Sequence, residues 1–142
     1  MDQRAAAVYY VLYRLTQQGY AASPTSGGQA DLMACTAEGT RVALVRVRTR
    51  ATNEPFRMLP EDRRTAGRNV CYAFVELPAA GARDPDVFLV RPALLAAMLE
   101  IDPNWPRDAR AFETLEDCRN AWQRLGLGGV SGVRSESVIS PA

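Results

Sequence analysis

The segment from Arg41 to Arg50 (RVALVRVRTR) constrains the fold of this chain more than any other feature, because apolar and charged side chains alternate along it. Successive side chains of a β-strand point to opposite faces of a sheet, so the alternation predicts a strand with two unlike faces. One face holds Ala43, Val45 and Val47, and the other holds Arg46, Arg48 and Arg50 beside Val42 and Leu44. One end of this strand is therefore expected to present a ladder of guanidinium groups.

A β-hairpin is expected to include this strand. Residues Ala30 to Thr36 have the composition of a short strand, and the dipeptide Glu38-Gly39 favours a turn between them and the arginine-containing strand. Asp31 then lies near the start of the first hairpin strand. The preceding stretch from Ser23 to Gly28 is dense in turn-forming residues and is expected to be a loop.

Two further strands complete the expected sheet. Residues Val70 to Leu77 (VCYAFVEL) are apolar on both alternations apart from Glu76, which is typical of a central strand buried on both faces. A shorter strand is expected from Val87 to Val90, after the turn at Asp84-Pro85-Asp86. The prediction is an α/β domain with a mixed, mainly four-stranded sheet that is flanked by helices.

Three helices are predicted from their end signals. Asp2 is expected to cap a helix that runs to Gln18 and stops at Gly19, with Ala5, Val8, Leu12 and Leu15 as its apolar stripe. Pro92 is expected to open a second helix that runs through Ile101. Thr114 is expected to cap a final helix that stops at Gly126 and buries Leu115, Cys118, Ala121, Trp122 and Leu125.

The chain length of 142 residues fits one compact domain, which is expected to span residues 1–127. Residues 128–142 are rich in glycine and serine, and are expected to form a flexible C-terminal tail. No apolar run is long enough to span a bilayer, and the N-terminal residues resemble a helix rather than a signal peptide. A cytoplasmic protein without a membrane partner is therefore expected.

The composition excludes several kinds of active site, because the chain contains seventeen basic residues that are all arginine, and no lysine or histidine. Schiff-base chemistry, a P-loop lysine, a Ser-His or Cys-His couple and an imidazole metal ligand are all excluded. The cysteines Cys35, Cys71 and Cys118 are scattered, so neither a disulfide framework nor a zinc site is indicated. Any active site must therefore use carboxylates, hydroxyls, thiols, amides or arginine.

The net charge of +1 is unevenly distributed along the chain. Residues 41–68 carry a charge of +5, from eight arginines against three acidic residues. A basic block of this kind is compatible with binding to a phosphate backbone. The alternative is a solvated face whose arginines pair with Glu54, Glu61 and Asp62. The regular spacing of Arg46, Arg48 and Arg50 favours the phosphate interpretation.

The order of helix, hairpin, crossover and strand over residues 1–101, with Asp31 opening one strand and Val47-Arg48-Thr49 on the next, resembles the PD-(D/E)XK nuclease superfamily. It is most similar to small bacterial restriction-endonuclease-like or Holliday-junction-resolvase-like proteins. The segment EDCRNAWQRLGL from Glu116 also resembles the helix that often closes such proteins. The resemblance implies a restriction-endonuclease-like fold and a site that contains Asp31, Arg46 and Arg48.

The chain departs from the superfamily pattern at the positions where chemistry occurs. Arg46 occupies the position of the second acid, and Arg48 occupies that of the lysine. The resemblance implies that Asp31 is a ligand of Mg²⁺ or Mn²⁺ if the protein is catalytic. One carboxylate beside two guanidinium groups is a poor site for a hard cation, so hydrolysis is expected to be lost or impaired.

Three functions are compatible with this pattern. The first is a nuclease-fold protein that binds nucleic acid, with DNA favoured, and has lost or impaired hydrolysis. The second is an active Mg²⁺- or Mn²⁺-dependent endonuclease in which Glu38, Glu54 or Asp2 supplies the missing acid. The third is a protein-interaction scaffold, as a homodimer by analogy with resolvase-like proteins. The nucleic-acid-binding residues expected for the first function are Arg46, Arg48, Arg50, Arg57, Arg63 and Arg64.

One further interpretation of the same residues involves no ligand. Asp31 can instead pair with Arg46 or Arg48 as an internal salt bridge, which makes the arginines part of the scaffold.

Overall fold

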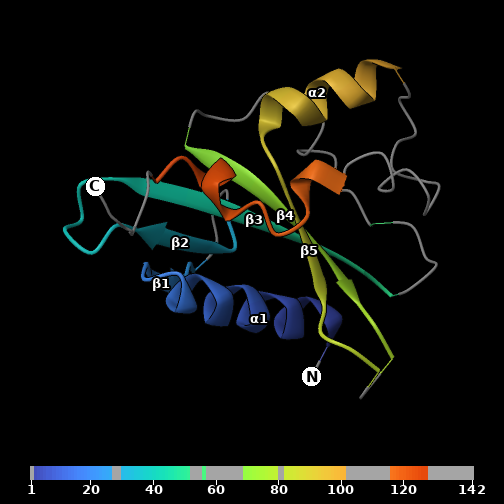
Figure 1. Cartoon of the computed structure of the whole chain (residues 1–142), viewed down its shortest axis with the longest axis horizontal. Coiled ribbons are helices and arrows are strands. Elements are labelled where there is room, and N and C mark those ends of the chain that lie inside the picture. Colours follow the sequence, from blue (N-terminus) through green and yellow to red (C-terminus); the bar gives the residue numbers. More distant parts are fainter. Residues whose placement is uncertain are drawn as a thin grey trace, which may run out of the picture.

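The computed structural model describes residues 2–26, 30–51, 56, 69–79, 82–101 and 116–127. These residues form an α/β structure in which a five-stranded mixed sheet separates two helices (Figure 1). The elements are α1 (Gln3–Gln17), β1 (Ala21–Pro24), β2 (Leu32–Cys35), β3 (Val42–Ala51), β4 (Val70–Leu77), β5 (Asp86–Val90), α2 (Pro92–Ile101) and the 3₁₀ helix η3 (Trp122–Leu125).

The strands lie in the sheet in chain order, from β1 to β5. Neighbouring strands are antiparallel except for β3 and β4, which are parallel. The predicted hairpin is confirmed by the antiparallel pairing of β2 with β3. Strand β4 is buried on both faces as predicted, although β3 rather than β4 is the middle strand of the five.

The fifth strand, β1, corrects the prediction of a loop that starts at Ser23. Ser23 and Pro24 pair with Met33 and Leu32 at the edge of the sheet. A proline lacks the N–H group that a ladder needs, and an edge strand is where this lack is tolerated. The turn-forming residues therefore concealed a short strand of four residues.

Helix α1 has the predicted ends but a different buried stripe. The Asp2 carboxylate accepts a hydrogen bond from the Ala5 N–H at 2.7 Å, and Gly19 follows the helix at a φ of 91°. The fully buried residues are Ala7, Val11 and Leu15, whereas Val8 and Leu12 are only partly buried and Ala5 lies at the margin. The small side chain of Ala7 allows this stripe to approach the sheet closely.

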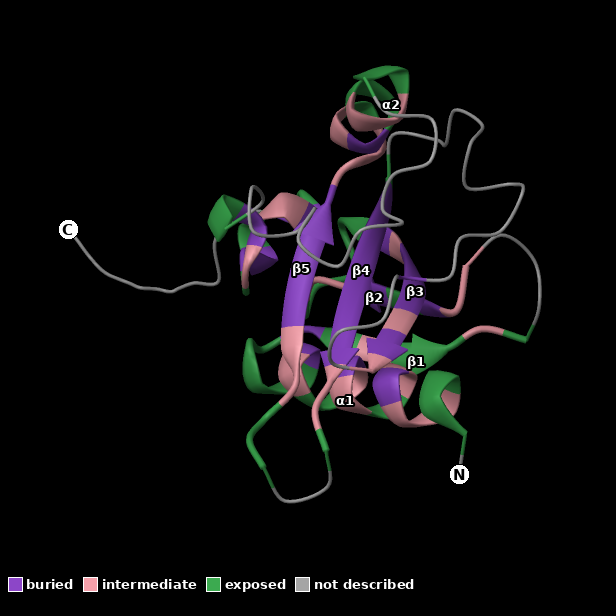
Figure 2. Cartoon of the chain, turned by 90° about the vertical axis from the view of Figure 1, so that its right-hand side faces the viewer, coloured by how far each residue is buried: buried purple, intermediate pink, exposed green. Residues whose placement is uncertain are grey.

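The two faces of the sheet are covered by different elements. Helix α1 packs on one face, over Val45, Val47, Cys71 and other small apolar side chains. Helix α2 begins and ends as predicted, and it contributes Leu95 to a second cluster on the opposite face. Figure 2 shows β4 and β5 coloured as buried along most of their length, between these two helices. None of the described helices is both long and apolar enough to cross a membrane.

The C-terminal segment differs from the predicted continuous helix. Thr114 and Leu115 lie outside the described residues, and from Glu116 onward the chain forms two short 3₁₀ turns that are separated at Asn120. Asn120 has a φ of 53°, and its N–H donates to the Val87 carbonyl oxygen at 2.7 Å. A left-handed residue interrupts an α-helix, and asparagine is one of the few residues that adopts this conformation readily. The segment thereby covers the outer edge of β5, and it ends as predicted at Gly126, whose φ is 76°.

Candidate functional site on the arginine face

The three arginines of β3 lie in register with the side chains of β4 and β5 on one face of the sheet. We call this surface the arginine face, and it consists of three cross-strand rows. The rows are Arg46–Tyr72–Val90, Arg48–Phe74–Phe88 and Arg50–Glu76–Asp86. Parallel pairing of β3 with β4 thus sets each guanidinium beside an aromatic ring or a carboxylate.

The predicted ladder of arginines exists, but it is covered. Arg46, Arg48 and Arg50 are only 8%, 6% and 7% exposed. Aromatic rings account for part of this burial: the Cζ atoms of Arg46 and Arg48 lie 5.5 and 5.9 Å from the centroid of the Tyr72 ring. Arg46 also donates a hydrogen bond from Nη1 to the Tyr72 hydroxyl oxygen at 2.6 Å. These guanidinium groups are therefore held by the sheet rather than extended into solvent.

Asp31 lies next to this face, immediately before β2, and its carboxylate receives three donors. Oδ2 accepts from the Val47 N–H at 2.7 Å and from Arg48 Nη1 at 3.4 Å. Oδ1 accepts from Nη2 of Arg4, near the start of α1. The Asp31 side chain is 6% exposed, while that of Arg4 is 66% exposed. The carboxylate therefore ties the first helix to the middle strand.

The geometry of the two strands explains why a carboxylate stands at this position. Strand β2 begins at Leu32, but β3 continues beyond it, so the Val47 N–H points to a place where β2 offers no backbone acceptor. The Asp31 side chain supplies that acceptor, and Arg48 Nη1 donates to the Val47 carbonyl oxygen at 2.9 Å. Unpaired strand groups are costly when buried, so Asp31 and Arg48 extend the ladder with side chains.

The structure thus contains an internal salt bridge at Asp31, which the sequence allowed as an alternative to a ligand site. Asp31 pairs with Arg48, whereas Arg46 bonds to Tyr72. The Arg48 guanidinium lies beside Asp31, where a divalent cation bound to this carboxylate would have to lie. It also neutralises the negative charge of Asp31 that would attract the cation.

The described residues do not bring further metal ligands to Asp31. Within residues 2–26, 30–51, 56, 69–79, 82–101 and 116–127, no three Asp, Glu, Cys or His side chains cluster in a way that suits a metal ion. Of the acids considered as replacements, Asp2 caps α1 and Glu38 is exposed in the turn between β2 and β3. Glu54 lies outside the described residues, as do three of the arginines expected to bind nucleic acid, Arg57, Arg63 and Arg64.

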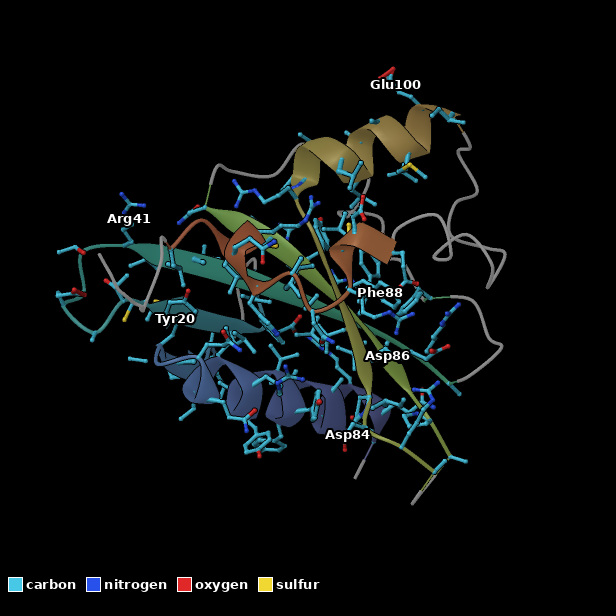
Figure 3. The ribbon with its side chains drawn as sticks, in the orientation of Figure 1. Tyr20, Arg41, Asp84, Asp86, Phe88 and Glu100 are labelled. Atoms are coloured by element: carbon cyan, nitrogen blue, oxygen red, sulfur yellow. The ribbon has the colours of Figure 1, made fainter. Side chains whose placement is uncertain are left out.

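A second ionic cluster on the arginine face was not predicted. Glu76 is buried, and it lies 3.0 Å from Arg50 and 3.3 Å from Arg83. Asp86 pairs with Arg83 at 3.1 Å and with Arg119 at 2.6 Å, beside Phe88 on the same strand (Figure 3). The sequence feature that could have predicted this cluster is Glu76, the single charged residue in the otherwise apolar strand β4.

The titration behaviour of the site follows from these contacts. Hydrogen bonding to Arg119 lowers the pKa of Glu116, and the bonds to Glu116 and Asp86 raise the pKa of Arg119. On the opposite face of the sheet, which α1 covers, burial raises the pKa of the Cys71 thiol to about 12. Cys71 is therefore un-ionised near neutral pH, as expected of a packing residue rather than a nucleophile.

Comparisons with known proteins do not assign a family. No protein-family model matches the chain, and neither the curated proteins nor the solved structures provide a significant match.

Proposed function

We propose that this chain is a restriction-endonuclease-like protein that binds nucleic acid, with DNA favoured, and does not hydrolyse it. The observation that carries the proposal is the Asp31 carboxylate, which is occupied by Arg4, Arg48 and the Val47 N–H. The proposed protein keeps the scaffold of a nuclease and replaces its metal centre with ion pairs.

The order and pairing of the elements support the nuclease-like scaffold. A helix is followed by three consecutive antiparallel strands, and then by a strand parallel to the third. Asp31 precedes β2 directly, and it reaches Arg48 and the backbone of Val47 on β3. This juxtaposition of an acid with the next strand agrees with the motif positions that the sequence resembles.

The identity of the groups around Asp31 supports the loss of hydrolysis. Metal-dependent hydrolysis needs oxygen ligands that hold a cation near the scissile phosphate. Arginine supplies no ligand atom and accepts no proton near neutral pH. With guanidinium groups at both motif positions, Arg46 and Arg48 supply neither a second metal ligand nor a titratable amine, and the described residues bring no cluster of metal ligands to Asp31.

The charge of the same region supports binding to a polyanion. Arg4, Arg46, Arg48 and Asp31 together carry a formal charge of +2 from three arginines and one aspartate. Arg46 and Arg48 are buried, so among these arginines the side chain open to a phosphate is that of Arg4, which is 66% exposed. Arginine binds phosphate oxygens through paired hydrogen bonds, and it retains its charge at all relevant pH values.

Fluorescence anisotropy with labelled duplex, branched and single-stranded DNA tests this proposal. We expect binding that weakens steeply with salt, and an Arg4→Gln change that lowers affinity more than Arg41→Gln. Arg41 is a matched control because it is exposed and lies before β3, well away from the N-terminal end of α1 (Figure 3). The parent protein should not nick plasmid DNA with Mg²⁺ or Mn²⁺. Absence of binding at low salt to all three probes contradicts the proposal.

A further inference from the structure

The short helix η3 holds two buried side-chain N–H groups that lack an acceptor. They are Nε of Arg124 and Nε1 of Trp122, and neither donates a hydrogen bond within the part of the chain that the structure describes. Native proteins rarely leave buried donors unmatched, and a bound ion or water molecule is the usual explanation where they do. Two such donors in one four-residue helix therefore indicate that an acceptor from outside the chain binds here.

Three arginines from three different elements surround η3. Arg124 belongs to η3 itself, Arg91 directly follows β5, and Arg14 lies in the last turn of α1. Nη1 of Arg91 lies 3.4 Å from the carbonyl oxygen of Arg124, and Cζ of Arg14 lies 5.4 Å from the centroid of the Trp122 ring. We call these three residues the η3 arginines, and their formal charge is +3.

The acids of the described residues do not neutralise this charge. Neither Arg14 nor Arg124 forms an ion pair with any of them, and the Arg124 side chain makes no hydrogen bond to them either. Arg119, on the same C-terminal segment, differs sharply, because it pairs with both Asp86 and Glu116. Arg124 is thus a half-buried guanidinium whose charge no described carboxylate compensates.

The guanidinium groups of Arg91 and Arg124 share one location, at the end of the sheet where β4 begins. Burial is the main cause of the raised pKa of the Cys71 thiol, and the charges of both arginines act on the same thiol in the opposite direction. Coulombic interactions weaken with distance, so both guanidinium groups lie near Cys71 and near each other. Gly126 ends η3 beside them and places no side chain between them.

We propose that Arg124 and Arg91 form a binding site for a phosphoryl group, with the buried Nε of Arg124 as one of its donors. A guanidinium offers Nε–H and a neighbouring Nη–H as a fork that fits two oxygens of a phosphate. Both residues are partly exposed, so the bound group lies at the surface with one oxygen directed inward. A water molecule would satisfy Nε alone, whereas a dianion also compensates the charge of both guanidinium groups.

This site is separate from the pair of Arg4 and Asp31 and does not depend on the proposed function. Arg4 and Arg14 lie near opposite ends of α1, which at 1.5 Å per residue separates them by about 15 Å. The same phosphoryl chemistry occurs in small phosphate esters and in the backbone of a nucleic acid. Phosphate binding is therefore measured first without nucleic acid, and the source is identified in a second experiment.

Titration with inorganic phosphate, followed in ¹⁵N–¹H correlation spectra, tests the site directly. The Nε–H signal of Arg124 should shift and saturate with a dissociation constant on the order of 1 mM. Sodium chloride at the same ionic strength should not reproduce the shift, because a monatomic ion does not fill the fork and only screens charge. A parent protein without a saturable response at about 50 mM phosphate overturns the proposal.

Arg124→Met should weaken phosphate binding at least about tenfold, as followed through the backbone amide signals of η3. Arg41→Met is the matched control, because Arg41 is exposed and lies before β3, and it should leave the affinity unchanged. Arg124→Met should not lower the melting temperature in phosphate-free buffer, because the lost side chain has no hydrogen-bond partner among the described residues. A phosphate affinity that is equal in Arg124→Met and the parent contradicts the site.

A second variant covers the case in which Arg124→Met does not fold. Arg124→Lys keeps the charge and removes the Nε–H donor, so it should bind phosphate several-fold more weakly than the parent. Circular dichroism should show parental helix content. Full retention of affinity in Arg124→Lys would show that charge alone attracts the anion, and the proposed fork would be wrong.

Fluorescence anisotropy with duplex DNA identifies the source of the phosphoryl group. A lower DNA affinity in Arg124→Met than in Arg41→Met assigns the site to a backbone phosphate, which places it on the nucleic-acid-binding surface. Equal DNA affinities of these two variants, together with phosphate binding by the parent, assign it to a small phosphate ester. Absence of DNA binding by the parent contradicts the proposed function alone.

Discussion

Replacing Asp31 with alanine should lower the free energy of unfolding by about 3–5 kcal/mol, because it leaves a buried guanidinium without its carboxylate. The change removes the acceptor of the Val47 N–H and the carboxylate that pairs with Arg48 Nη1, and both donors belong to the middle strand of the sheet. A buried donor without an acceptor pays its full desolvation cost. Urea denaturation monitored by circular dichroism measures the effect.

Asp84→Ala provides the matched control for this prediction. Asp84 is an exposed aspartate between β4 and β5, so its removal should change stability little. A double-mutant cycle of Asp31→Ala with Arg48→Met should show a strong coupling between the two positions. If Asp31 were kept for metal binding, its removal from the metal-free protein would be neutral or stabilising, and that result would contradict its role as an anchor.

Replacing Glu76 with glutamine should lower the free energy of unfolding by about 2–4 kcal/mol, because Glu76 is the shared partner of two guanidinium groups. Arg50 is buried, and its Nη2 lies 3.0 Å from the Glu76 carboxylate. Glutamine keeps the size of the side chain and some of its hydrogen-bonding capacity, but it removes the charge. The loss should be smaller than for Asp31→Ala, because an acceptor oxygen is retained.

Glu116→Gln distinguishes burial from charge in this second cluster. Glu116 pairs with Arg119 and is exposed, so the same chemical change should have no measurable effect on the denaturation midpoint. Equal effects of Glu76→Gln and Glu116→Gln would show that the buried pair does not dominate the cluster.

The strands and helices with strong local signals were predictable from the sequence. Alternation along residues 41–50 correctly predicted which side chains share a face, and the continuous apolar run of 70–77 correctly predicted a strand buried on both sides. The ends of α2 followed from Pro92 and the apolar run after it. These features depend on periodicity within a single segment, which a sequence displays directly.

Features that depend on contacts between segments were not predictable. Alternation places Arg46, Arg48 and Arg50 on one face, but their burial depends on the register with β4, which brings Tyr72 beside two of them. Likewise, the sequence placed Asp31 near β3 without deciding between a metal and Arg48 as its partner. That choice depends on where β2 begins relative to β3.

The segment around Asn120 and the strand β1 were missed for a different reason. In both places a local conformational preference competes with a tertiary contact. Turn-forming residues up to Pro24 pair with β2 at the edge of the sheet. The helical sequence pattern is interrupted at Asn120, whose N–H bonds to β5. Pairing with an existing strand outweighs a propensity difference of about 1 kcal/mol or less per residue.

Calorimetric titration with Mn²⁺ tests most directly whether Asp31 is an anchor of the fold instead of a metal ligand. The parent and Asp31→Asn proteins should take up Mn²⁺ equally weakly, because Arg4, Arg48 and the Val47 N–H already occupy the carboxylate. Arg46→Glu with Arg48→Lys, checked for folding, serves as the positive control, because it supplies a second carboxylate and removes a guanidinium from Asp31. That variant should bind Mn²⁺ better than the parent. A Mn²⁺ site in the parent protein that disappears in Asp31→Asn would contradict the account.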